Sequence, residues 1–277
     1  MSDTSPAPIK RPPRNLSATS LGFHLFGLSL KRHIRSRKTL FLFLVQLIPV
    51  VLALFSRITG NGGGLAEFEA TFTQVYLPYL LPLAALFFGG PTVVDEVEGR
   101  TITYLTLRPL SRSTLFLSKL ATSIALAIVV TVIPVILFFA VSVIGSADPM
   151  GGSLATLGAA IASTVGGATA YTAIFALLGV IFASTLLPGI VYYLVFEIIL
   201  GALPVIEFIS IKFHVFTLGG FRRGVDGEER LRDEIARFLL DQPLEFDWWV
   251  GLLCLIFVTT AAVVLSATVF RNRQFHV

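Results

Sequence analysis

The sequence predicts an all-α protein that crosses a membrane six times, and three observations carry this prediction. Of the 277 residues, 55% are hydrophobic and only 14% are charged, with a mean hydropathy of +0.82, whereas soluble domains carry about one-quarter charged residues. The apolar residues gather in six long stretches that suit a hydrocarbon core of about 30 Å. The charged residues collect at the ends of those stretches, as membrane topology requires.

Two segments precede the first predicted span. Residues 1–20 are rich in Pro, Ser and Thr and are predicted to be a disordered tail. Over residues 21–38, apolar side chains recur at helical spacing and basic side chains follow, which predicts a helix at the membrane surface with its basic end toward anionic headgroups. A signal peptide is the competing interpretation, but the apolar stretch after Lys38 is long and lacks a small-residue cleavage pattern.

The six predicted spans form one transmembrane domain, 39–270, followed by a short tail, 271–277. Prolines in the second span are tolerated where neighbouring helices satisfy the freed carbonyls. Small residues four apart in the fourth span favour close helix packing, either within one subunit or across a dimer. Two tryptophans mark the membrane interface before the sixth span. The predicted spans are residues 39–56, 74–94, 115–144, 154–182, 186–206 and 248–270.

The orientation follows from the distribution of Lys and Arg. The N-terminal segment carries eight of them, residues 95–112 with Lys119 carry four, and the tail carries two, while the two short loops on the other side carry none. The positive-inside rule therefore places both termini in the cytoplasm. Residues 212–247 carry six Lys or Arg and eight Asp or Glu, and the span count places this mixed segment outside the cytoplasm.

No recognisable catalytic or metal-binding motif is present. The sequence has neither the Gly-x-x-x-x-Gly-Lys-Ser/Thr phosphate loop nor the Gly-x-Ser-x-Gly pattern of hydrolases. Its four histidines are far apart, without the spacing of metal ligands. The one cysteine, Cys254, lies in an apolar run and excludes a disulfide framework. We therefore expect no metal or cofactor on this chain, and an intramembrane enzyme lacks the paired polar groups it would need.

One acidic residue, Glu197, is expected deep inside the fifth span. A carboxylate at mid-bilayer costs about 2.5–3.5 kcal/mol on translocon scales, so it is usually buried in the helix bundle or in a wet cavity. With Tyr192 and Tyr193 nearby, Glu197 can face a substrate pathway or carry a proton. It can equally be protonated and hydrogen-bonded to a neighbouring helix. The sequence leaves both interpretations open.

The charged segment 95–112, between the second and third spans, is the strongest candidate site. Glu96 and Glu98 lie in the first turn of a predicted short helix, and Pro109 ends it because the residue before a proline is disfavoured in the helical conformation. Acidic groups at its start and Arg108 at its end suit the helix dipole. A helix of two to three turns can present one face to a partner. The alternative is a plain polar hairpin between two spans.

This segment resembles the corresponding segment of ABC-2-type transporter permeases. In that family it joins the second and third of six spans and contains the coupling helix, which docks on a separate ATP-binding subunit. The resemblance covers essentially the whole chain, and the one departure is an arginine inserted between the glycine and the threonine. The residues that carry it are Glu98-Gly99-Arg100-Thr101, Leu105, Arg108-Pro109-Leu110-Ser111-Arg112 and Lys119.

The resemblance implies that the chain is the membrane half of an ATP-driven exporter and is not itself an enzyme. Two copies, identical or paired with a relative, would enclose the pathway above two ATP-binding cassette ATPase subunits that carry ATP and Mg. The expected location is the bacterial inner membrane, with no role for nucleic acid. The residues expected to contact the ATPase subunit are Glu96, Glu98, Gly99, Arg100, Thr101, Ile102, Tyr104, Leu105, Pro109 and Arg112.

A self-contained secondary carrier or channel is the alternative function. Secondary carriers often contain inverted repeats and helices interrupted near mid-membrane, and the prolines in the second span and around Pro188 and Pro204 give this interpretation weak support. The sequence does not define the cargo. Its 24 phenylalanines suit a hydrophobic substrate and lipid-facing surface equally well.

Overall fold

The computed structural model describes residues 36–60, 63–90, 112–144, 146, 150–182, 184–203, 206–221 and 246–272. The predicted tail 1–20, most of the predicted surface helix 21–38 and most of segment 212–247 lie outside these residues. The described elements are all helices: α2 (Arg37–Gln46), α3 (Ile48–Ile58), α4 (Leu65–Thr71), η1 (Phe72–Leu80), α5 (Leu81–Gly89), α8 (Arg112–Val143), α9 (Met150–Phe182), α10 (Leu186–Tyr192), η2 (Tyr193–Ile199), η3 (Leu200–Ala202), η4 (Glu207–Ile209), α11 (Ile211–Gly219) and α13 (Trp248–Asn272).

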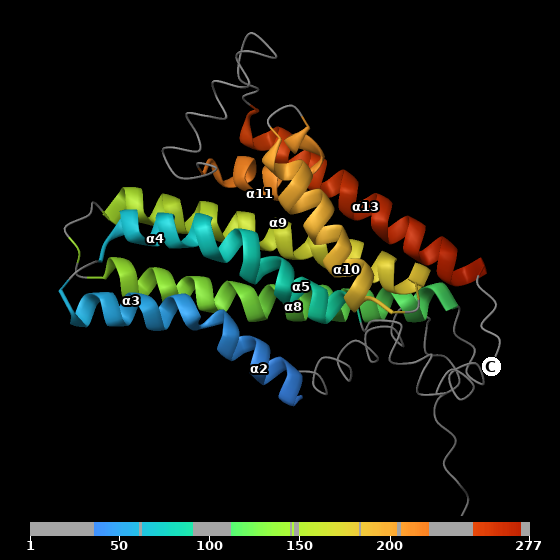
Figure 1. The fold of residues 1–277 in the computed structure, drawn as a ribbon, viewed down its shortest axis with the longest axis horizontal. Helices are drawn as coiled ribbons and strands as arrows, with labels where there is room; N and C mark the ends of the chain where they lie inside the picture. The colour runs from blue at the N-terminus through green and yellow to red at the C-terminus, as the bar shows by residue number, and fades with distance from the viewer. Residues whose placement is uncertain are drawn as a thin grey trace, which may run out of the picture.

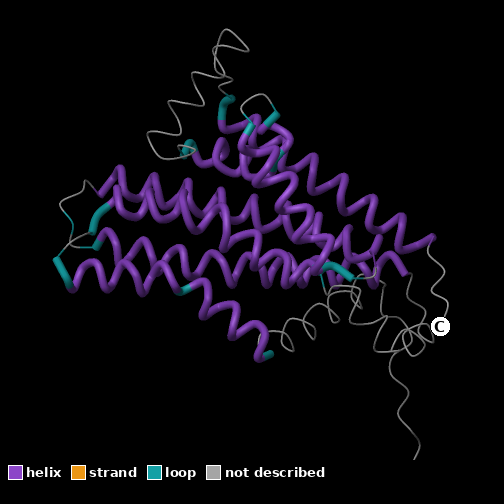
Figure 2. The backbone as a smooth tube through the Cα atoms, viewed as in Figure 1, coloured by secondary structure: helices purple, strands orange, loops and turns teal. Residues whose placement is uncertain are grey.

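The predicted all-α class is confirmed for the residues that the structure describes (Figures 1 and 2). Five helices there are long and apolar enough to cross a membrane. They agree with five of the six predicted spans, and the remaining prediction, 186–206, falls on a shorter helix. The five candidate spans are Arg37–Ile58, Leu65–Gly89, Phe116–Val143, Gly152–Phe182 and Trp248–Arg271.

The first span bends at Leu47, where α2 ends and α3 begins. Pro49 is the cause, because it has no N–H to donate to the carbonyl of Val45 in the preceding turn. The side chain of Gln46, fully buried beside the bend, donates from Nε2 to the Leu80 carbonyl at 2.7 Å. The bend is therefore tied to the second span.

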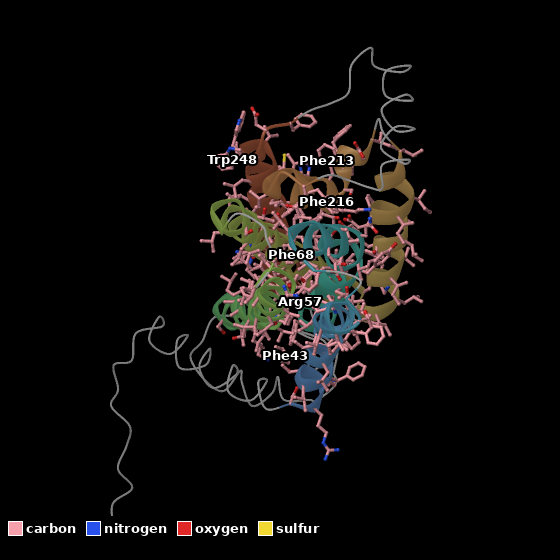
Figure 3. All side chains as sticks on the ribbon, turned by 90° about the vertical axis from the view of Figure 1, so that its left-hand side faces the viewer. Phe43, Arg57, Phe68, Phe213, Phe216 and Trp248 are labelled. Atoms are coloured by element: carbon pink, nitrogen blue, oxygen red, sulfur yellow. The ribbon has the colours of Figure 1, made fainter. Side chains whose placement is uncertain are left out.

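The second span begins nine residues before its predicted start, because α4, η1 and α5 follow one another without a break. The extra turns contain Glu67 and Glu69, and these two charged residues are why the sequence predicted a loop there. They also contain Phe68 and Phe72, whose rings stack at 5.5 Å and are fully buried. In the view along the bundle (Figure 3), Phe68 lies among the central helices. Burial of these aromatic rings therefore extends the helix.

Helix α9 is at the centre of the bundle and packs against α5, α8, α11 and α13. Its small residues allow this close packing. A Cβ atom at Gly167 would lie 2.6 Å from Leu81 Cδ2 and 3.0 Å from Val215 Cγ2. Gly166 similarly faces Leu218 and Leu255. These two glycines thus serve packing within one subunit, one of the two interpretations of the small residues in this span.

The predicted fifth span is shorter than expected. Its helical part consists of α10, η2 and η3, with 7, 7 and 3 residues, and is about 25 Å long at about 1.5 Å per residue. It ends at Leu203, whose backbone is extended at φ −92° and ψ 115°. The reason is Pro204, since a residue before a proline is pushed out of the helical conformation.

The first residues of the predicted polar segment 212–247 belong to the core instead. They form α11, in which Phe213, Val215 and Phe216 are buried between α9 and α13. Figure 3 shows Phe213 and Phe216 beside α13. The helix ends at Gly219, and the next residue, Gly220, is left-handed at φ 65°, a conformation that favours glycine.

One end of the bundle, which we call the Gly64 end, holds the junctions between the first and second spans and between the third and fourth. The N–H of Gly64 donates to the Ser142 carbonyl at 2.6 Å, and Arg57 Nη2 donates to the same carbonyl at 3.3 Å. Ser142 is in the last turn of α8, where a cation also suits the helix dipole. Arg57 is the one Lys or Arg that the orientation count above did not assign.

The opposite end, the Gly90 end, holds the end of α5, the start of α8 and the ends of α9 and α13. Phe116 and Phe270 stack with ring centroids 5.4 Å apart, and Val180 of α9 is buried with them. Thr185, just before α10, donates its hydroxyl to the Gly90 carbonyl at 3.0 Å. Helices α8 and α9 run between these two ends along the horizontal direction of Figure 1, and α13 runs obliquely to them toward the Gly90 end.

Candidate functional site

The predicted coupling residues of segment 95–112 lie almost entirely outside the described residues, and their role stays a prediction. Arg112 is the first residue of α8, and the side chains of α8 are described from Phe116 onward. The structure does describe both sides of the segment, because α5 leads to Gly90 and α8 begins at Arg112, both at the Gly90 end. The residues outside are Glu96, Glu98, Gly99, Arg100, Thr101, Ile102, Tyr104, Leu105 and Pro109.

Where the second span reaches the Gly90 end, α5, α9 and the start of α10 approach so closely that the glycines there have no room for a Cβ atom. A Cβ atom at Gly179 would lie 2.6 Å from Thr185 Oγ1 and 2.9 Å from the Gly90 carbonyl oxygen. A Cβ atom at Gly89 would lie 2.5 Å from the Thr172 carbonyl oxygen. Separations below 3.0 Å between such atoms require something to move. We call Gly89, Gly90, Gly179 and Thr185 the glycine junction.

From this junction, α10 and η2, which we call the strut, run antiparallel to α5 and η1. Three contacts hold the two together, one from Thr185 just before the strut and two from within it, and their spacing of four residues places them on one helix face. The contacts join Thr185 to Gly90 by a hydrogen bond, Gly189 to the Leu86 side chain by packing, and the Tyr193 hydroxyl, as donor, to the Pro78 carbonyl.

The carboxylate of Glu197, in the last part of the strut, is only 2% exposed and accepts four hydrogen bonds. Oε2 accepts from the Ser210 hydroxyl at 2.6 Å and from the Lys212 N–H at 3.0 Å. Oε1 accepts from the Ile211 N–H at 3.1 Å and from the Tyr192 hydroxyl at 3.3 Å. The two backbone N–H groups can only donate, so both carboxyl oxygens act as acceptors toward α11.

Glu197 therefore caps the N-terminus of α11 from another helix. The first N–H groups of a helix have no partner within it and carry a partial positive charge, so a carboxylate is favourable there. Ser210 is the N-cap residue of α11 and links its own helix to the same carboxylate. In this arrangement Glu197 hydrogen-bonds a neighbouring helix, as one of the two interpretations of the sequence expects.

The three residues predicted for the substrate pathway are only partly brought together. Tyr192 contacts Glu197, and its ring packs edge-on against Phe175 at 6.0 Å and stacks on Phe196 at 5.0 Å. Tyr193 turns away, toward Pro78 on η1. Sequence reasoning missed Ser210, although a serine just before an apolar run that ends in two glycines is a signal for a short capped helix.

The described residues contain no group of three or more His, Cys, Asp or Glu side chains that could hold a metal ion. Cys254 is a free, half-buried thiol on α13.

The fold defines a multi-pass helical membrane protein. A family model described as "ABC-2 family transporter protein" matches residues 30–201. Because the match covers more than half of the chain, the protein belongs to the ABC-2 family, and the predicted resemblance is confirmed. A search of curated proteins found no match.

Family membership makes the chain the transmembrane subunit of a transporter. Such a subunit is not itself catalytic, and membership implies an ATP-binding cassette subunit as its partner. The family match spans α2 to η3. Helices α11 and α13 follow it in the chain.

Proposed function

We propose that this chain couples ATP hydrolysis on a separate ATP-binding cassette subunit to the export of a substrate. The observation that carries the proposal is that segment 91–111 leaves the bundle at Gly90 and rejoins it at Arg112, at the same end. Lys119 and Arg271 belong to the helix ends there. By the positive-inside rule this end faces the cytoplasm, as do both termini, in a bacterial inner membrane.

In this proposal segment 95–112 is the coupling helix. Apolar side chains seat it in a groove of the ATPase subunit, charged side chains fix its register, and the partner carries ATP and Mg. Closure of the ATPase pair then moves the ends of α5 and α8. The apolar contacts are Ile102, Tyr104 and Leu105, the charged contacts are Glu96, Glu98, Arg100 and Arg112, and Gly99 and Pro109 mark the helix ends, with Thr101 between them.

We further propose six crossings and a two-copy assembly. A sixth crossing is supported by the positions of α9 and α13, because Val180 near the end of α9 and Phe270 near the end of α13 pack together at the Gly90 end. In this proposal the chain therefore crosses once between them, and the strut begins that crossing. A second permease copy, identical or related, and two ATPase subunits complete the transporter.

A self-contained secondary carrier is the second candidate function. The observation that favours it is the helix break at Leu203 beside the buried carboxylate of Glu197, since carriers bind substrates at the termini of broken helices. The donors at the N-terminus of α11, however, are already bound to Glu197. A substrate anion would first have to displace a residue of the chain, which makes the coupled permease the better-supported function.

The decisive test is to replace residues 95–112 with a Gly-Ser linker of equal length. The full chain is coexpressed with its ATP-binding cassette partner subunit. We expect the native chain to copurify with that subunit and to stimulate its ATPase activity, and the replaced chain to do neither while remaining in the membrane. Replacing residues 225–242 in the same way is the matched control, which should keep both properties. If the chain without residues 95–112 still copurifies with the ATPase subunit and still stimulates its ATPase activity, the proposal is wrong.

The orientation gives a separate prediction. Because Cys254 is the only cysteine, a Cys254→Ser background permits labelling at a single introduced thiol. We expect Arg108→Cys to react with an impermeant maleimide only after the cells are permeabilised. Thr59→Cys, at an exposed position of the Gly64 end, should react in intact cells. Labelling of Arg108→Cys in intact cells would contradict the cytoplasmic position of the coupling segment.

A further inference from the structure

We propose that the strut fastens α11 to the second span, so that displacement of the Gly90 end of α5 also displaces α11. Glu197 is the positioning residue that joins the strut to α11. The source of the displacement rests on the proposed function, but the mechanical link is a property of this chain alone.

The first step is the attachment of the strut to the second span. Much of the strut surface is not in contact with the second span. Leu187 is 73% exposed, and Val191 and Leu194 are also exposed. The contacts of Thr185, Gly189 and Tyr193 with the second span form a single seam. The hydrogen bonds of Thr185 and Tyr193 lie at the two ends of this seam, the first at the end of α5 and the second on η1.

The contact of Tyr193 has a specific cause. Proline has no backbone N–H, so Pro82 cannot donate to the Pro78 carbonyl one turn earlier. The Tyr193 hydroxyl supplies a donor to that carbonyl. Both η1 and η2 are π-helical, a wide-turn geometry that appears mostly as short interruptions of helices. The two interrupted stretches are thus joined to each other.

The second step is the attachment of the strut to α11. The four hydrogen bonds to Glu197 include two from backbone N–H groups of α11, those of Ile211 and Lys212. These N–H groups lie in the first turn of α11 and have no partner within that helix, so the carboxyl group of Glu197 satisfies them. The helix that contains Glu197 ends at Leu203, whose backbone is extended. The strut and α11 are therefore separate helices, and the side chain of Glu197 connects them.

The third step is the packing of α11 against the remaining helices. A Cβ atom at Gly251 of α13 would lie 2.8 Å from the His214 carbonyl oxygen and 3.0 Å from the Leu218 nitrogen. With so little space, α11 cannot shift without moving α13. Cys254, less than one turn beyond Gly251 on α13, is a native reporter of that movement. The link therefore runs from Gly90 through Glu197 to α13.

The first arm of the test measures the fastening without any partner. Amide hydrogen exchange of the full chain in lipid nanodiscs is compared with that of Glu197→Gln, in which an amide donor faces the donors of α11. We expect exchange of the Ile211 and Lys212 amides to become at least about tenfold faster. The half-exposed Glu69, at the Gly64 end, provides the control variant Glu69→Gln. Unchanged exchange in Glu197→Gln would overturn the role of Glu197.

The second arm measures transmission in the complex with the ATPase subunit. The readout is the rate at which N-ethylmaleimide modifies Cys254, followed by mass spectrometry of its peptide, with and without nucleotide. We expect a nucleotide-dependent rate in the native complex. In Thr185→Val, Tyr193→Phe and Glu197→Gln the nucleotide-free rate should stay the same and the dependence should disappear. The matched controls are Thr268→Val and Tyr79→Phe, whose side chains are exposed.

The outcomes of the two arms separate the inference from the proposed function. If no ATPase subunit copurifies, the proposed function fails, and the exchange experiment still decides whether Glu197 fastens α11. If the native complex forms but Cys254 modification does not depend on nucleotide, transmission to α13 is wrong. If the dependence persists in the three variants, transmission does not use the strut.

Discussion

Substitution of Gly89 by alanine is expected to destabilise the protein strongly, because the added methyl group has nowhere to go. Its Cβ atom would lie 2.5 Å from the Thr172 carbonyl oxygen and 3.1 Å from Phe175 Cβ, both on α9. These atoms are fixed to the central helix, so the ends of α5 and α9 must separate. Overpacking of this kind costs about 1–3 kcal/mol. The thermal unfolding midpoint of the purified full chain, in one detergent, measures the loss.

Gly158→Ala is the matched control for this prediction. Gly158 also lies within a long helix, α9, but a Cβ atom there meets nothing within 4 Å. Alanine is the better helix former by about 1 kcal/mol, so this variant should unfold at the same temperature as the native chain or higher. Equal midpoints for Gly89→Ala and Gly158→Ala would show that the glycine junction is not tightly packed.

The double substitution of Glu98 and Arg112 by alanine is expected to abolish most of the ATPase stimulation while leaving the chain inserted in the membrane. In the proposed coupling helix these two charges fix the register against the ATPase subunit. Loss of central interface contacts costs about 2 kcal/mol or more, which lowers affinity by at least about tenfold. ATP hydrolysis by the reconstituted complex, measured against the ATPase subunit alone, gives the effect.

A second pair of opposite charges provides the control for that experiment. Glu228 and Arg232 lie in another polar segment of the sequence, the one between α11 and α13, and the proposal gives them no contact with the ATPase subunit. Their double alanine variant should keep native stimulation. Full stimulation in the Glu98/Arg112 variant would remove these residues from the coupling contact.

The long spans could be predicted from the sequence because each is an apolar run with clear limits. The sixth span begins at Trp248 in both the prediction and the structure, and the fourth ends at Phe182 in both. The start of the second span could not be placed, since Glu67 and Glu69 break the apolar pattern. Only the packed structure shows that Phe68 between them is buried.

The partners of Glu197 at the start of α11 were beyond sequence analysis for a different reason. Ser210, Ile211 and Lys212 are 13 to 15 residues away along the chain, and they reach Glu197 only because the helix stops at Leu203 and the chain turns back. Pro204 signals the stop, but no local pattern signals the direction of the turn. Sequence alone thus identified the unusual carboxylate without its role.

The distribution of buried surface over the bundle limits how two copies can associate. Of the five long spans, the first and the last are the least buried, and they lie on opposite sides of the molecule (Figures 1 and 3). A twofold pair uses one contiguous patch of each subunit. That patch cannot contain both spans, so in any such pair one of them borders on the annulus of lipid tails.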